Sequence, residues 1–188
     1  MTKRKSPQET RAKTPSPDTL PPVLAVVGRS KTGKTTLVER LIHALAEKGY
    51  CVGTMKDARG GFEIDLEGKD SDRHYRAGAQ AVAVLSSEQE KMAFFGRLSV
   101  QTPIDEICRR LFPDVDLIIL EGFKTLRFPK IETTLGESLS CYGDPDLLAV
   151  VGEAPGGTAD VPCFSLADAP AVVALIEDRL NLNTRRPG

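Results

Sequence analysis

Residues 28–35 have the types and spacing needed to bind a nucleoside triphosphate. Gly28, Gly33, Lys34 and Thr35 are the fixed positions of the pattern G-x-x-x-x-G-K-T. The backbone N–H groups of such a loop point at phosphate oxygens, and its glycines allow the tight path. The lysine reaches the β- and γ-phosphates, and the threonine hydroxyl binds Mg²⁺. The pattern therefore predicts a nucleotide phosphate site with Mg²⁺.

The loop stands between a predicted strand and a predicted helix. The apolar run 23–27 precedes it, and Gly49 ends the helix that follows. Apolar residues in that helix recur at the spacing of one helical face, namely Leu37, Val38, Leu41, Ile42 and Leu45. Because the run 50–55 reads as a second strand, we expect a βαβ unit with parallel strands and a right-handed crossover.

The rest of the chain continues the alternation of strands and helices. Strands are expected at 81–85, 92–95, 116–121, 147–151 and 162–164, and helices at 103–111 and 169–180. The run 117–120 is continuously apolar, as in a strand buried on both faces. We predict an α/β fold of the P-loop NTPase type, a mostly parallel sheet with helices on both faces.

Composition suggests one domain between two tails. Residues 1–21 are rich in proline and basic side chains and nearly free of apolar ones, which predicts a disordered tail. The nucleotide-binding domain is expected over 22–182, and 183–188 are expected to be a flexible C-terminus.

Charge and cysteine usage argue against several classes of partner. A net charge of −1 gives no reason to expect nucleic acid or a membrane surface. The 4 cysteines show no C-x-x-C pair, which gives little support to a disulfide framework or a structural zinc site. We expect a cytoplasmic protein with reduced thiols.

A phosphate loop needs an acidic partner for Mg²⁺. Glu121 ends the apolar strand 117–120, and the carboxyl ends of parallel strands are where ligands gather. A second acid is expected in the charged, glycine-rich stretch after the second strand, where Asp57, Asp65 and Asp70 are alternatives. Nothing in the sequence indicates a general base for hydrolysis, so the catalytic residues are unknown.

Three further segments stand out after the phosphate loop. They are Gly-Lys-Asp-Ser at 68–71 with the Arg-His and Ala-Gly-Ala that follow it, Glu-Gly-Phe-Lys at 121–124, and Pro-Lys-Ile-Glu at 129–132. Taken in order with the phosphate loop, they resemble the MobB family of molybdopterin-guanine dinucleotide biosynthesis adapter proteins. The similarity runs from about residue 23 to about residue 180. It implies a GTP-binding protein with weak GTPase activity that assists a MobA-type guanylyltransferase in attaching GMP to molybdopterin.

The resemblance also implies roles for individual residues. The phosphates would be held by Gly28, Ser30, Lys31, Thr32, Gly33, Lys34, Thr35 and Thr36, and Mg²⁺ by Thr35, Asp65 and Glu121. Contacts to pterin or phosphate would come from Lys56, Lys69, Arg73, His74, Lys124 and Lys130. Where relatives offer an aspartate to guanine, this chain has Glu153, whose carboxylate accepts the same two hydrogen bonds. The family forms homodimers, and the strand 92–95 is a candidate contributor.

Other functions remain alternatives. An ATP-dependent small-molecule phosphotransferase or ligase of the dethiobiotin-synthetase type would use the same loop and Mg²⁺. A GTPase that delivers nickel would need clustered cysteine and histidine ligands, which are scarce here. A pure interaction module would not need the intact loop.

Overall fold

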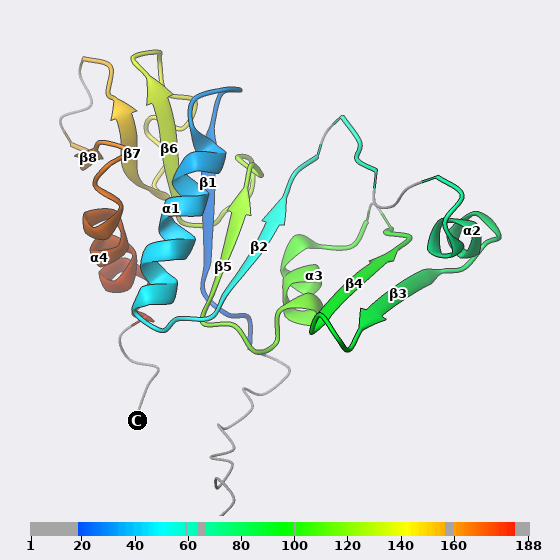
Figure 1. Cartoon of the computed structure of the whole chain (residues 1–188). Helices are drawn as coiled ribbons and strands as arrows, with labels where there is room; N and C mark the ends of the chain where they lie inside the picture. Colours follow the sequence, from blue (N-terminus) through cyan, green and yellow to red (C-terminus); the bar gives the residue numbers. More distant parts are fainter. Residues whose placement is uncertain (1–18, 59, 64–66, 100, 157–159, 183–188) are drawn as a thin grey trace, which may run out of the picture. The chain divides into compact units, whose positions relative to one another are not determined.

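A computed structural model describes residues 19–58, 60–63, 67–99, 101–156 and 160–182. The chain divides into two compact units, a larger one of residues 1–56 and 108–188 and a smaller one of residues 57–107 (Figure 1). The single domain expected over 22–182 spans parts of both units, and its boundaries stay a prediction. Residues 1–18 and 183–188, which make up most of the two predicted tails, lie outside the described residues.

The larger unit is built on a parallel six-stranded sheet with the order β2-β5-β1-β6-β7-β8. The strands are β1 (Val23–Gly28), β2 (Val52–Lys56), β5 (Leu117–Glu121), β6 (Lys130–Leu135), β7 (Leu147–Glu153) and β8 (Cys163–Phe164). The mostly parallel α/β sheet expected from the sequence is confirmed.

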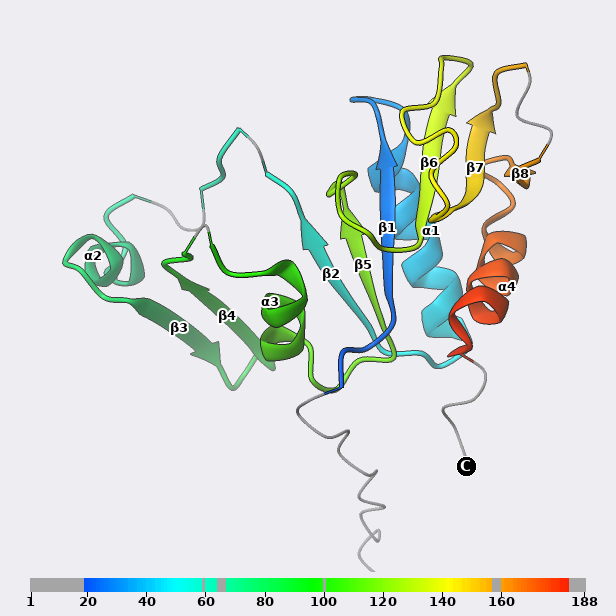
Figure 2. The ribbon, with the colours of Figure 1, turned by 180° about the vertical axis from the view of Figure 1, so that it is seen from behind.

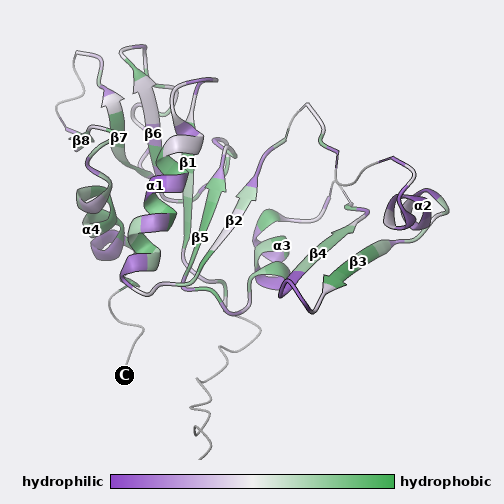
Figure 3. Cartoon of the chain, viewed as in Figure 1, coloured by the Kyte–Doolittle hydropathy of each residue, from purple (hydrophilic) through white to green (hydrophobic). Residues whose placement is uncertain are grey.

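Helices α1 (Lys34–Glu47) and α4 (Ala169–Leu180) pack side by side on one face of this sheet (Figures 1 and 2). The apolar side of α1 faces the strands, and Figure 3 shows its hydrophilic residues alternating with hydrophobic ones along the helix. The shared core consists of Leu24, Val26, Leu37, Leu41, Leu45, Ile119, Val172, Val173 and Ile176, all without exposed surface. Burial of each such side chain contributes about 1.5–3 kcal/mol, so this core fixes the strand–loop–helix passage between β1 and α1.

The smaller unit consists of helix α2 (Asp70–Arg76) and an antiparallel hairpin of β3 (Ala81–Ser86) and β4 (Lys91–Gly96). One hairpin face carries the buried pair Val82 and Phe95, and the ring of Tyr75 meets Phe95 edge-on with centroids 5.6 Å apart. Residues on the other face are exposed, namely Ala83, Leu85, Met92 and Phe94. Helix α3 (Ile104–Leu111) runs across the boundary in sequence between the two units. None of the helices in the described part of the chain is long and apolar enough to cross a membrane.

Strand β6 was not expected from the sequence, because its residues do not form an apolar run. Its polar side chains are buried and paired instead. The carboxylate of Glu132, 2% exposed, accepts hydrogen bonds from the backbone N–H and the hydroxyl of Ser140, both at 2.7 Å, and from the N–H of Cys141 at 2.9 Å. These bonds fix the segment 136–146, which connects β6 to β7.

A second polar contact anchors the same segment. Lys130 is 1% exposed, and its ammonium donates to Asp144 Oδ2 at 2.6 Å and to the carbonyl of Leu126 at 3.1 Å. The hydrogen bond from Lys130, followed by that from the N–H of Asp146, lowers the pKa of Asp144. The pair therefore stabilises the fold while Asp144 is ionised.

Asp144→Asn is expected to destabilise the protein by roughly 3 kcal/mol, because removal of one partner leaves a buried charge uncompensated. The folded-state pKa of Asp144 lies below its unfolded value of about 3.9, so the pair contributes stability above that pH and loses it as the pH falls through the folded value. Chemical denaturation between pH 3 and pH 7 measures both effects, and the wild type should lose its advantage over the variant at the acid end. Asp178→Asn, at a side chain 82% exposed, is the control and should change little. Equal stability of the Asp144 variant and the wild type at pH 7 would contradict this role.

Candidate nucleotide-binding site

The loop between β1 and α1 has the geometry expected of a phosphate loop. β1 ends at Gly28, and α1 begins at Lys34 after Gly33, which is the N-cap residue with φ of 92°. The carbonyl of Gly33 accepts the first helical hydrogen bond from Leu37 at 2.9 Å. The loop thus sits at the positive end of a helix, which attracts anions.

Gly28 allows the loop to pass close to the neighbouring strand β6. Its φ is 136°, and a Cβ at this position would lie 2.4 Å from the carbonyl oxygen of Thr133. The buried hydroxyls of Thr32 and Thr133 lie 2.7 Å apart, and Thr133 also donates to the carbonyl of Val27 at 3.2 Å. Thr133 therefore supports the loop from another strand. No sequence pattern links it to the loop, because it lies 101 residues after Thr32.

Lys34 folds back over the loop. Its ammonium donates to the carbonyls of Gly28, at 3.1 Å, and Arg29. Phosphate oxygens are charged and accept stronger hydrogen bonds from an ammonium than carbonyls do. Lys34 is therefore placed to exchange its two carbonyl partners for a phosphate.

Glu121 lies beside the start of α1, as the sequence analysis expected of a carboxylate at the end of β5. The hydroxyl of Thr35 donates to its two carboxylate oxygens at 3.1 and 3.2 Å, and Lys56 Nζ lies 2.9 Å from Oε1. The strand register brings Glu121 to these partners, because Glu121 pairs with Val26 of β1 and with Lys56 of β2. The Glu121 side chain is only 13% exposed, so its charge is held against the loop.

The oxygens of Thr35 and Glu121 fit Mg²⁺, which prefers hard oxygen ligands and takes few of them from protein when phosphates supply the rest. The described residues contain no group of three or more His, Cys, Asp or Glu side chains that could hold a metal by themselves. Asp65, the other predicted metal ligand, lies outside the described residues.

Other predicted nucleotide contacts lie along the same edge of the sheet. Ser30, Lys31 and Thr36 are exposed in the loop and the first turn of α1, whereas Thr32 is buried beneath the loop. Glu153 ends β7 with an exposed side chain, next to Leu135 at the end of β6. The base contact predicted for Glu153 stays a prediction.

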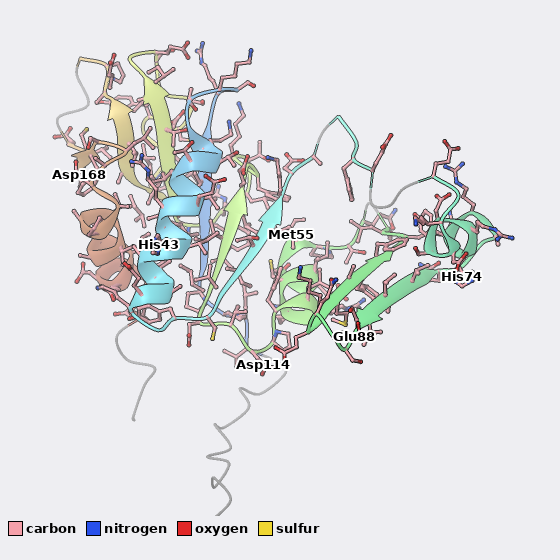
Figure 4. The ribbon with its side chains drawn as sticks, viewed as in Figure 1. His43, Met55, His74, Glu88, Asp114 and Asp168 are labelled. Carbon is pink, nitrogen blue, oxygen red and sulfur yellow. The ribbon has the colours of Figure 1, made fainter. Side chains whose placement is uncertain are left out.

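Two of the predicted pterin or phosphate contacts line a cavity in the smaller unit. The cavity measures about 500 Å³ and is lined by Asp70, Arg73, His74, Arg76 and Ala77. Lys69 precedes α2 as its N-cap residue, and Figure 4 labels His74 on that helix. The N–H of Gly68 donates to Asp72 Oδ2 at 2.9 Å, and this bond, followed by the one from Arg76 at 2.9 Å, lowers the pKa of Asp72.

The remaining two predicted contacts differ in exposure. Lys124 is exposed in the turn after β5. Lys130 is buried, and its ammonium is already paired with the carboxylate of Asp144. The sequence does not distinguish a buried lysine from an exposed one. The ligand role predicted for Lys130 is therefore not part of the function proposed for this chain.

Sequence reasoning gave no role to Arg29, the second residue of the loop. Its Nε lies 3.4 Å from Glu137 Oε2, and its Nη2 donates to the hydroxyl of Ser138 at 3.2 Å. Both partners belong to the segment 136–146 that Glu132 fixes.

Comparison with known proteins identifies the family. The family model described as molybdopterin guanine dinucleotide synthesis protein B matches residues 23–153. The molybdopterin-guanine dinucleotide biosynthesis adapter protein of Haemophilus influenzae is 33% identical over 111 residues, which cover 58% of this chain and 61% of that protein. The adapter protein of Escherichia coli is 37% identical over 120 residues, which cover 60% and 65%. The chain thus spans about three fifths of the length of the curated relatives it matches.

Solved structures of MobB proteins are similar to this chain over a larger share of its length. A crystal structure of molybdopterin-guanine biosynthesis protein B has a TM-score of 0.68 and 30% identity, and the match covers 85% of this chain and 99% of that one. A MobB protein homolog from Bacillus stearothermophilus has a TM-score of 0.64 and 27% identity, with 87% and 99% covered.

Gly28→Ala is expected to destabilise the protein by roughly 2–3 kcal/mol, because the added Cβ overlaps the backbone of Thr133. Gly143→Ala is the matched control, since Gly143 also has a positive φ, of 80°, but a Cβ there meets nothing within 4 Å. It should cost about 1 kcal/mol from backbone strain alone. Denaturant unfolding of both variants measures the difference, and equal losses would refute the close passage at Gly28.

Proposed function

This chain belongs to the family of molybdopterin guanine dinucleotide synthesis protein B, and we propose from that membership and from the loop geometry that it is a GTP-binding adapter. It assists a MobA-type guanylyltransferase in joining GMP to molybdopterin. The observation that carries the proposal is the meeting of the phosphate loop with Thr35 and Glu121 at the carboxyl edge of the sheet.

Triphosphate binding follows from the loop. The backbone N–H groups of residues 30–36 surround the phosphates, and Lys34 leaves the carbonyls of Gly28 and Arg29 for the β- and γ-phosphates. The exposed cations of the loop, among them Lys31, add favourable charge.

Thr35 and Glu121 hold Mg²⁺, with Asp65 proposed as a further ligand on the basis of the family pattern. The ion supplies charge neutralisation between the phosphates. Lys56 must then share or release Glu121 Oε1, to which it lies at 2.9 Å, and its ammonium becomes free to contact phosphate. Slow hydrolysis is expected, as the family resemblance implies.

Glu153 provides the preference for guanine. Its carboxylate accepts hydrogen bonds from the N1–H and the amino group of guanine, and adenine lacks that pair of donors. An ATP-dependent phosphotransferase or ligase uses the same loop, but the family match does not favour that alternative.

The smaller unit contributes the pterin-side contacts. Its cavity of about 500 Å³ presents Arg73 and His74, with Lys69 at the start of the same helix, and these cations suit the phosphate of molybdopterin. Lys124, in the larger unit, stays a predicted phosphate contact on the basis of the resemblance alone. The protein works in the cytoplasm as a homodimer, in which a second copy covers the apolar hairpin face of Ala83, Leu85, Met92 and Phe94.

Lys34→Ala is expected to weaken Mg·GTP binding by roughly 100-fold, because two or more charge-assisted hydrogen bonds to phosphate are lost. Equilibrium binding of a fluorescent GTP analogue measures the change. Lys91→Ala removes an exposed lysine on β4 and should bind like the wild type. Normal GTP affinity in the Lys34 variant would rule out the phosphate assignment.

Phe94→Glu is expected to convert the dimer to monomers, because it places a charge in the apolar hairpin face. Light scattering after gel filtration measures the mass. Lys91→Glu lies on the same strand but on the opposite face, so it should leave the mass unchanged. An unchanged mass of the Phe94 variant would remove the hairpin from the interface.

A further inference from the structure

Arg29 is the second residue of the phosphate loop, and its backbone is held there. Its carbonyl accepts hydrogen bonds from the ammonium of Lys34 and from the hydroxyl of Thr32, the latter at 2.9 Å. Lys34 is the residue that the loop pattern directs to the β- and γ-phosphates. The backbone of Arg29 is therefore in contact with the group that will meet those phosphates.

The side chain of Arg29 is held in surface contacts and is not buried. Its guanidinium rests on Glu137 and Ser138, yet the Arg29 side chain is 57% exposed and that of Glu137 is 50% exposed. Exposed ion pairs of this kind contribute little to stability. A phosphate offers the fork of an arginine two charged acceptors at once, and it is a stronger partner than one exposed carboxylate.

The backbone of Glu137 is held in place, as the backbone of Arg29 is. The carbonyl of Glu137 accepts a hydrogen bond at 3.1 Å from the hydroxyl of Thr134, which is buried in β6. Glu132 holds the following residues of the segment from the same strand. The two backbones are therefore held, and the contact between the exposed side chains of Arg29 and Glu137 can break without a change in either strand or loop.

We propose that Arg29 is a catalytic residue, which turns from Glu137 to the terminal phosphates of the bound nucleotide and stabilises the charge that develops there during hydrolysis. This inference rests on the proposed binding of Mg·GTP. In the step, an oxygen of water bonds to the γ-phosphorus as the bond from that phosphorus to the β–γ bridging oxygen breaks. The water proton passes to the released phosphate, and the products are GDP and inorganic phosphate. The guanidinium neutralises charge on the γ- and bridging oxygens.

If Arg29 only tethered the loop to the segment 136–146, different results would be expected. Loss of the tether would lower the stability of the protein and would affect binding of the ground state and of the transition state equally. A catalytic arginine affects the transition state more than the ground state.

The test compares Arg29→Ala with Arg179→Ala, which removes an arginine of almost the same exposure, 56%, from the end of α4. Single-turnover hydrolysis of Mg·GTP in Arg29→Ala should slow by at least about 10-fold, while binding of Mg·GTP weakens less. Binding of GDP with Mg²⁺ and aluminium fluoride, which resembles the transition state, should weaken by a similar factor to the rate. Arg179→Ala should match the wild type in all three measurements. Arg29→Lys should recover only part of the rate, because an ammonium lacks the fork.

Glu137→Gln tests the contact between Arg29 and Glu137. Loss of the competing carboxylate should raise the rate about 2–5-fold in an otherwise wild-type chain and have no effect when Arg29 is alanine, which is the signature of a coupled pair. If the wild type binds Mg·GTP and Arg29→Ala hydrolyses it within twofold of the wild-type rate, the inference is overturned. If the wild type does not bind Mg·GTP, the proposed function itself fails.

Discussion

The parallel register of β5, β1 and β6 is the constraint on which the site depends. It pairs Glu121 with Val26 on one side of β1 and Thr133 with Gly28 on the other. The loop that leaves β1 therefore has a carboxylate on one flank and a buried hydroxyl on the other. The hydrophobic contacts of α1 with the sheet hold this register, because the helix that begins at Lys34 can pack only where its apolar face meets β1 and β5.

Three cations around the loop are held in contacts that a ligand can replace. Lys34 is bonded to carbonyls of its own loop, Lys56 to Glu121, and Arg29 to Glu137 and Ser138. The fold thus keeps positive charge near the loop without burying it unpaired, which would be costly. In the account proposed here, a bound triphosphate with Mg²⁺ takes over these partners together. Nucleotide occupancy then changes contacts at Glu121 and at Glu137, on opposite sides of β1.

Much of this arrangement could be predicted from the sequence. The phosphate loop has a strict spacing, α1 has a clear apolar period, and Glu121 follows an apolar run, so each has a local pattern. Strand β6 was missed because its polar side chains find partners that are distant in sequence, such as Asp144, 14 residues from Lys130, and Thr32, 101 residues from Thr133. Thr133 and Glu137 were missed for a related reason, since they meet the loop only through the pairing of β1 with β6. Lys130 was predicted as a ligand contact because a sequence does not reveal burial.

The most direct test of the central claim is isothermal titration calorimetry of the full chain with Mg·GTP and with Mg·ATP, alone and with a molybdopterin-loaded guanylyltransferase. The account predicts selective binding of GTP that becomes tighter when the transferase is present. Preferential binding of ATP, or GTP binding that is indifferent to the transferase, would contradict the adapter function.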